Sequence, residues 1–338
     1  MSHLHDHVGP HTPGTDVNLL AGSNEGPANP AVARSARQSG GPTRAVSWDV
    51  AVALLIGLMA GVLGLAPWLV TGAQLPLQNL WGSEALPAQM PVALLPLSQY
   101  ESTTLVALMT TGGAAAGLTV RRWSPARRLL ATWCAAGGVV LVQVTAAIQA
   151  FTVVGEGLAP GSRSSLYLVG LLSGVVAATV AGLVSLFLLA AKSRSLAALG
   201  VGVAAVPFVS WVATGVTHFA GVGNVPMFVT TLWAWFPAVL VGVALAWCGL
   251  RPRVRALVWL VNLGLLWVTP ALFTAVRSVL GTRVLGGDLQ EMAAMGKQVF
   301  AAGLGPSGGA GPTILLALAI ALVGTFVRVP ARYQGRTS

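Results

Sequence analysis

Very few side chains that could do chemistry lie inside the long apolar stretches of this sequence. The deepest polar ones are Gln143, Gln149 and Asn262, whose amides can all donate and accept hydrogen bonds. Such groups either bond neighbouring helices or contact a substrate, and bonding between helices is the commoner use in apolar surroundings. No carboxylate lies near the middle of an apolar stretch, which disfavours a proton relay or a Na⁺ site built on carboxylates.

Charged and titratable groups occur instead at the ends of the apolar stretches. Glu101 precedes one stretch, His218 closes another, and Arg277 lies in the last turns of a third. If folding brings them together, His218 could exchange protons near neutral pH while Arg277 binds an anionic head group or a carboxylate. They are candidate substrate-binding residues, and the alternative is a set of side chains that reach water at helix ends.

Three consecutive apolar stretches combine an internal proline with tryptophans. The prolines Pro207, Pro237 and Pro270 predict kinks, because each removes one backbone hydrogen bond. The tryptophans are Trp211, Trp233, Trp235 and Trp267. They could line an outward-opening cavity for an apolar or lipidic ligand, or they could be core residues whose indole N–H bonds a nearby oxygen.

The polar N-terminal segment carries a short histidine cluster, made of His3, His5, His7 and His11. Imidazoles at this spacing could bind Zn²⁺, Ni²⁺ or Cu²⁺ weakly. An incidental or weak metal-binding tail is favoured, because the apolar stretches offer no matching path of metal ligands. The chain also lacks a phosphate-binding loop and a dinucleotide-binding glycine motif, so no cofactor is expected.

The composition defines the class of protein that must position these residues. Of 338 residues, 55% are apolar and 8% are charged, with a mean hydropathy of +0.76. A soluble domain has about a quarter of its residues charged, so soluble classes are excluded. The sequence predicts an all-α, polytopic helical bundle in a membrane.

Eight stretches are long and apolar enough to cross about 30 Å of hydrocarbon as helices. They cover residues 48–70, 103–120, 129–151, 166–191, 196–218, 227–250, 256–280 and 313–329. Residues 1–46 are predicted to be a disordered polar tail, residues 47–330 the transmembrane domain, and residues 331–338 a short basic tail. Two long outer loops, residues 71–102 and 281–312, are expected to cap the outer mouth, the second through an amphipathic helix on the membrane surface.

The basic residues sort to alternate ends of the predicted helices. Those flanking one side include Arg121, Arg127, Arg128, Lys192 and Arg253. Since basic loops are held in the cytoplasm, both termini are predicted to be cytoplasmic. This sorting explains the net charge of +10, so no nucleic-acid partner is implied. It also predicts attraction to the lipid bilayer through anionic lipid head groups.

Glycine pairs at four-residue spacing predict close helix contacts, as expected where helices pack in lipid. Three such pairs stand out: Gly57 with Gly61, Gly113 with Gly117, and Gly170 with Gly174.

The leading hypothesis is a multi-pass protein of a bacterial plasma (inner) membrane that binds or translocates a small or lipidic molecule through an outward-facing cavity. The bacterial origin is inferred from the preference for Arg over Lys: 17 of the 19 basic residues are Arg, which suggests a bacterium with GC-rich DNA. One alternative is a non-catalytic subunit that stabilises a membrane protein partner. The other is an outward-facing membrane enzyme that uses His218 with Glu101 or Glu156.

Overall fold

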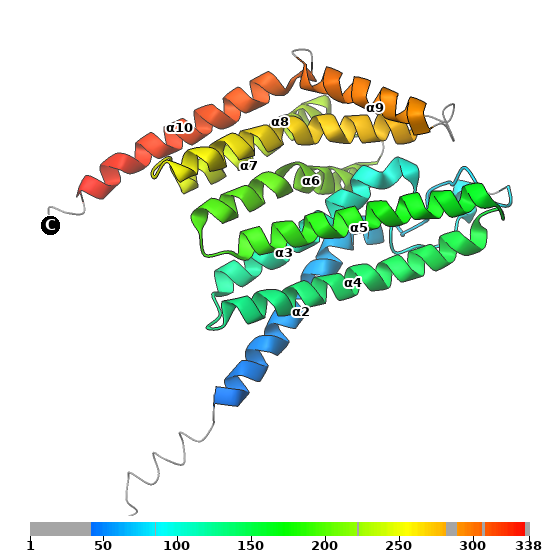
Figure 1. Cartoon of the computed structure of the whole chain (residues 1–338), viewed down its shortest axis with the longest axis horizontal. Coiled ribbons are helices and arrows are strands. Elements are labelled where there is room, and N and C mark those ends of the chain that lie inside the picture. The colour runs from blue at the N-terminus through cyan, green and yellow to red at the C-terminus, as the bar shows by residue number, and fades with distance from the viewer. Residues whose placement is uncertain (1–41, 85, 222, 282–288, 306–307, 335–338) are drawn as a thin grey trace, which may run out of the picture. The chain divides into compact units, whose positions relative to one another are not determined.

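A computed structural model describes residues 42–84, 86–221, 223–281, 289–305 and 308–334 (Figure 1). The chain divides into two units, Met1–Ala45 and Val46–Ser338, and the second contains every candidate membrane span of the described residues. Its described residues form helices and two isolated β-bridges but no strand. The predicted all-α class is therefore confirmed.

The helices follow the apolar stretches closely. They are α2 (Pro42–Val70), α3 (Ser102–Trp123), α4 (Arg128–Gly157), α5 (Ser162–Ala190), α6 (Arg194–Ala220), α7 (Met227–Cys248), α8 (Val254–Gly281), α9 (Leu289–Leu304) and α10 (Ala310–Gln334), with two short 3-10 helices, η1 (Pro87–Gln89) and η2 (Gln99–Glu101). Among the described residues, eight helices are long and apolar enough to cross a membrane, which is all of these α-helices except α9. The chain is a multi-pass membrane protein by this criterion.

One end of the bundle collects the basic loops, and we call it the basic end. The Arg121 guanidinium, at the end of α3, donates to the Ala191 carbonyl after α5. Arg121 and Arg194 both lie over the Trp247 ring near the end of α7, at 5.0 and 5.7 Å from its centroid. The connections α3–α4, α5–α6 and α7–α8 therefore meet at this end.

The first and last spans share the direction of their neighbours. In α2, Gly57 packs against Ala135 and Gly61 against Val142, so α2 runs parallel to α4 and begins at the basic end. In α10, Ala317 packs against Gly242, and Gly324 against Ala246. Because α7 and α10 are parallel by these contacts, α10 ends at the basic end too.

Glycines set the closest helix contacts in the bundle. A methyl group added at Gly113 would lie 2.1 Å from the carbonyl oxygen of Gly182 in α5, and one added at Gly117 would lie 2.5 Å from that of Leu186. Only hydrogen fits there, so α3 and α5 approach with their backbones almost touching. The prediction was wrong for Gly170 and Gly174, because a methyl group added at either position would have no atom of another described residue within 4 Å.

Residues 71–84 and 86–101, which we call the cap segment, fold over the ends of α2 to α5 opposite the basic end. Leu95 and Leu97 are fully buried there, and the Gln149 side chain of α4 accepts from the Leu94 N–H and donates to the Val92 carbonyl. Gln149 lies about 12 Å along α4 from its end at Gly157. The cap segment therefore enters the bundle instead of lying on its surface.

The helix that precedes the last span packs along α8. A methyl group added at Gly296 would lie 3.2 Å from the Val279 side chain, and one at Gly303 would lie 2.9 Å from Ala271, so α9 runs back antiparallel along α8 (Figure 1). Ala271 is about 15 Å from the end of α8. Contrary to the expectation of a helix on the membrane surface, α9 packs beside α8, and α10, which is long enough to cross a membrane by itself, follows it.

Candidate functional site

The middle of the bundle has a polar contact among α3, α4 and α5. Gln143 lies halfway along α4, about 22 Å from either helix end, and its side chain is 2% exposed. Its Nε2 donates to the Met109 carbonyl of α3 at 3.2 Å. Gly182 of α5 leaves room for this amide, since a methyl group there would lie 3.6 Å from Nε2 and 2.7 Å from the Met109 carbonyl oxygen.

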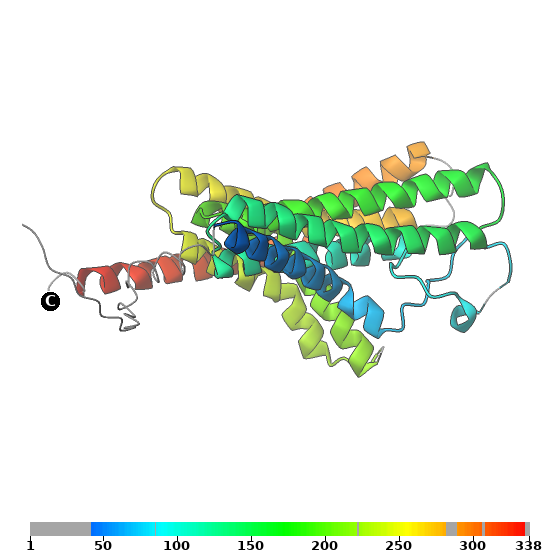
Figure 2. The same cartoon turned by 90° about the horizontal axis from the view of Figure 1, so that it is seen from below.

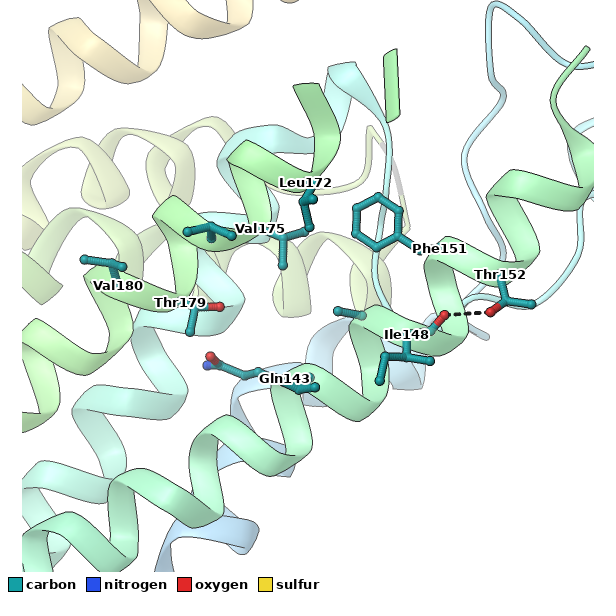
Figure 3. Close-up of a pocket in the computed structure, with 11 residues that line it drawn as sticks. Gln143, Ile148, Phe151, Thr152, Leu172, Val175, Thr179 and Val180 are labelled. Atoms are coloured by element: carbon teal, nitrogen blue, oxygen red, sulfur yellow. Dashed lines mark hydrogen bonds between the residues drawn. The ribbon is translucent and has the colours of Figure 1, made fainter. Parts of the chain in front are cut away.

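A groove between α4 and α5 begins at Gln143 (Figure 3). Its volume is about 640 Å³, within the range of pockets that hold small molecules. The lining residues on α4 are Gln143, Val144, Ala147, Ile148, Phe151 and Thr152, and those on α5 are Leu172, Val175, Val176, Thr179 and Val180. All but three of these side chains are hydrocarbon, so the groove favours an apolar occupant.

The groove opens outward from the bundle, toward the surface that contacts lipid. Ile148 and Val176, on opposite walls, are 64% and 54% exposed, whereas Val175 beneath them is buried. From Gln143 to Thr152 the groove extends about 14 Å along α4, away from the basic end. The mouth of the groove therefore lies on the outer surface of the helix bundle.

The inner end of the groove offers a hydrogen-bond acceptor. Gln143 Oε1 is buried and has no partner among the described residues. Figure 3 shows the Gln143 amide turned toward Thr179, whose hydroxyl lies 3.6 Å from the Met109 sulfur. An unpaired buried carbonyl oxygen costs about 1–3 kcal/mol, so a hydroxyl or N–H donor in the groove would relieve that cost once a rotation of the Gln143 amide exposes Oε1, which is closed to solvent in the structure.

Asn262, another amide singled out by the sequence, has a different environment. It is fully buried in α8, and its Nδ2 donates to the Val258 carbonyl one turn back, at 2.8 Å. Its Oδ1 has no partner and faces Gly202 of α6, where a methyl group would come within 2.0 Å. Asn262 is enclosed by helix packing and does not line the α4–α5 groove.

The charged candidates lie at the ends of three different elements, η2, α6 and α8. His218 lies in the last turns of α6 and is exposed, and Arg277 lies in the last turns of α8. Figure 2 shows the α6–α7 hairpin diverging from the ends of α8 and α9. Glu101 ends η2, which packs against α8. Whether His218 and Arg277 share a proton-exchange site therefore stays a prediction.

Trp211 connects α6 to the first span. Its indole Nε1 donates to the Gly64 carbonyl of α2 at 2.8 Å, and its ring stacks on Phe208 at 6.1 Å between centroids. This is the structural use of a buried tryptophan, with an apolar body and a bonded N–H.

The other three candidate tryptophans are more open. Trp233 and Trp235 are half-buried on α7, and Trp267 of α8 is exposed. None of them lines the α4–α5 groove, so their role in ligand binding stays a prediction.

The histidine cluster at residues 3–11 lies outside the described residues. Within the described part of the chain, no group of three or more His, Cys, Asp or Glu side chains is placed to hold a metal ion.

Sequence reasoning identified Gln143 but missed its surroundings. Nothing in the sequence marks Thr179 or the apolar groove walls as part of a binding site, because Thr and Val are ordinary in a membrane helix. The groove arises from how far α4 and α5 separate, which depends on contacts between helices remote in sequence. Comparisons with protein-family models, curated proteins and solved structures found no match to this chain.

Proposed function

We propose that this protein binds a largely apolar molecule, dissolved in the bilayer and carrying one hydrogen-bond donor, in the groove between α4 and α5. The observation that carries the proposal is the unpaired Gln143 Oε1 at the inner end of an apolar groove. The groove walls supply affinity through buried hydrocarbon surface. The single acceptor supplies selectivity, because a ligand without a donor leaves it unpaired.

Features of α6 to α10 support a carrier function in addition to binding. Pro207, Pro237 and Pro270 lie inside α6, α7 and α8, where each removes one backbone hydrogen bond. Transporters use helices broken within the membrane as the parts that rearrange around a substrate. The proposed carrier takes its ligand from the lipid and moves it by rearrangement of this half of the bundle.

The proposed setting is the inner membrane of a bacterium, with the basic end facing the cytoplasm. Support comes from the basic loops, which alternate with acid-containing segments along the chain as the positive-inside rule requires. In this orientation the groove opens to the outer half of the bilayer.

A pair of photoreactive probes tests the binding proposal. The purified protein in nanodiscs is cross-linked with a diazirine-bearing hexadecanol or with its methyl ether, which differs only in lacking the donor. We expect the alcohol to label α4 and α5 about tenfold more than the ether, because an unmade hydrogen bond at a buried carbonyl costs about 1–3 kcal/mol. Gln143→Leu is expected to abolish that difference.

Two further variants form the controls. Val176→Trp fills the groove and is expected to reduce labelling by the alcohol, whereas Val169→Trp, at an exposed α5 position outside the groove, is expected to leave it unchanged. Equal labelling of the natural protein by the alcohol and the ether would contradict the proposal. So would a Gln143→Leu variant that retains the preference.

A further inference from the structure

Two arginines at the basic end are already used by the fold. Arg128 donates through Nε to the Ala190 carbonyl at 2.8 Å, and through Nη2 to the Arg121 carbonyl at 3.4 Å. Arg121 donates to the Ala191 and Lys192 carbonyls. The Ala190, Ala191 and Lys192 carbonyls lie at the C-terminal end of α5, where the helix dipole places partial negative charge, so both arginines fix the α3–α4 connection against the end of α5.

A second cavity lies beside this junction, with a volume of about 740 Å³. It is lined by Ala126, Arg127, Arg128, Leu129, Leu130, Thr132, Phe187, Ala190, Ala191 and Lys192. Three of these residues are cationic and none is acidic. A cavity with this lining has a positive potential that no carboxylate within it offsets.

Arg127 and Lys192 differ from Arg128 in being exposed. They come from two different connections, α3–α4 and α5–α6, which the Arg121 and Arg128 bonds hold together. Their charges are therefore available at one opening. Arg121 and Arg194, which share the Trp247 ring, add positive potential nearby.

The cavity continues into an apolar surface on the helices. Leu129 is 80% exposed and Leu130 is 40% exposed, and both belong to the first turn of α4. Phe187 of α5 lines the cavity and packs against Trp133, with ring centroids 4.7 Å apart. Cationic groups at the mouth with hydrocarbon directly below match the two parts of a phospholipid, a phosphate and its acyl chains.

We infer that this cavity binds the phosphate-bearing head group of an anionic phospholipid, with Arg127 and Lys192 on the phosphate and an acyl chain along Leu129, Leu130 and Phe187. A soluble phosphate ester shares the head-group chemistry but would leave the apolar surface unused. The site is independent of the α4–α5 groove, because it shares none of the groove's lining residues.

Native mass spectrometry of the full chain, released from nanodiscs that contain equal phosphatidylglycerol and phosphatidylcholine, tests the inference. The natural protein is expected to retain phosphatidylglycerol in preference. The double variant Arg127→Gln, Lys192→Gln is expected to lose affinity for it by tenfold or more, since a basic residue near a membrane surface contributes about 1 kcal/mol toward anionic lipid. Leu129→Gln, which keeps every charge, is expected to weaken retention through the chain contact alone.

The matched control is Arg251→Gln, Arg253→Gln, which removes the same charge from exposed positions of the α7–α8 connection that do not line the cavity. It is expected to retain the lipid. Equal loss in both double variants would show general surface attraction and overturn the site. No preference for phosphatidylglycerol in the natural protein would overturn it as well, and so would glycerol 3-phosphate that binds as tightly as the lipid.

Discussion

At the residue scale, position within an apolar stretch was enough to single out Gln143 and Asn262, but not to separate their roles. The two amides are alike in sequence, and both prove to be buried with an oxygen that has no partner. They differ in their neighbours: Gln143 lines an open groove, whereas Asn262 faces Gly202. Those neighbours come from helices remote in the chain, which a pattern within one helix does not reveal.

The glycines allow a matched prediction at the same scale. Gly113→Ala is expected to destabilise the bundle by about 1–3 kcal/mol, because a methyl group would meet the Gly182 carbonyl and push α3 from α5. Gly170→Ala is expected to be close to neutral, since no atom lies within 4 Å of the added methyl. The stability of each purified variant is measured by titration with denaturing detergent, with loss of helix followed by circular dichroism. Similar stabilities for the two variants would contradict the described α3–α5 contact.

At the element scale, the eight spans could be predicted from hydropathy because each must bury an apolar length fixed by the membrane. Their ends were less predictable: α4 continues to Gly157, beyond the apolar stretch that ends at 151. A helix keeps its own hydrogen bonds after it leaves the hydrocarbon, so polarity at Glu156 does not end it. The path of α9 was not predictable, because its contact with α8 depends on Gly296 and Gly303, which an amphipathic pattern treats as neutral.

A cross-linking measurement tests the position of α9. In a background without Cys134 and Cys248, cysteines at Gly296 and Val279 are expected to form a disulfide on mild oxidation, because the added Cβ at Gly296 lies 3.2 Å from a Val279 methyl carbon and disulfides need Cβ atoms about 3.5–4.5 Å apart. Lys297→Cys paired with Val279→Cys is the control, since the next residue points about 100° around the helix. Cross-linking at 297 but not at 296 would refute the described packing.

At the scale of the whole molecule, both proposed sites depend on how the bundle sits in the membrane. The basic connections meet at one end, and the first span begins and the last span ends there. Their charge predicts that this end faces the cytoplasm. The groove then draws ligand from the outer half of the bilayer, and the basic cavity meets the leaflet that carries anionic lipid in this orientation.

Cysteine labelling in intact cells tests this orientation most directly. In the cysteine-free background, Ala126→Cys and Ser193→Cys place thiols in two basic connections, and Ser83→Cys places one in the cap segment; all three positions are exposed. A membrane-impermeant maleimide is expected to label the cysteine at 83 in intact cells, and those at 126 and 193 only after permeabilisation. Labelling at 126 or 193 before permeabilisation would contradict the orientation, and labelling at only one of them would contradict the eight-span arrangement itself.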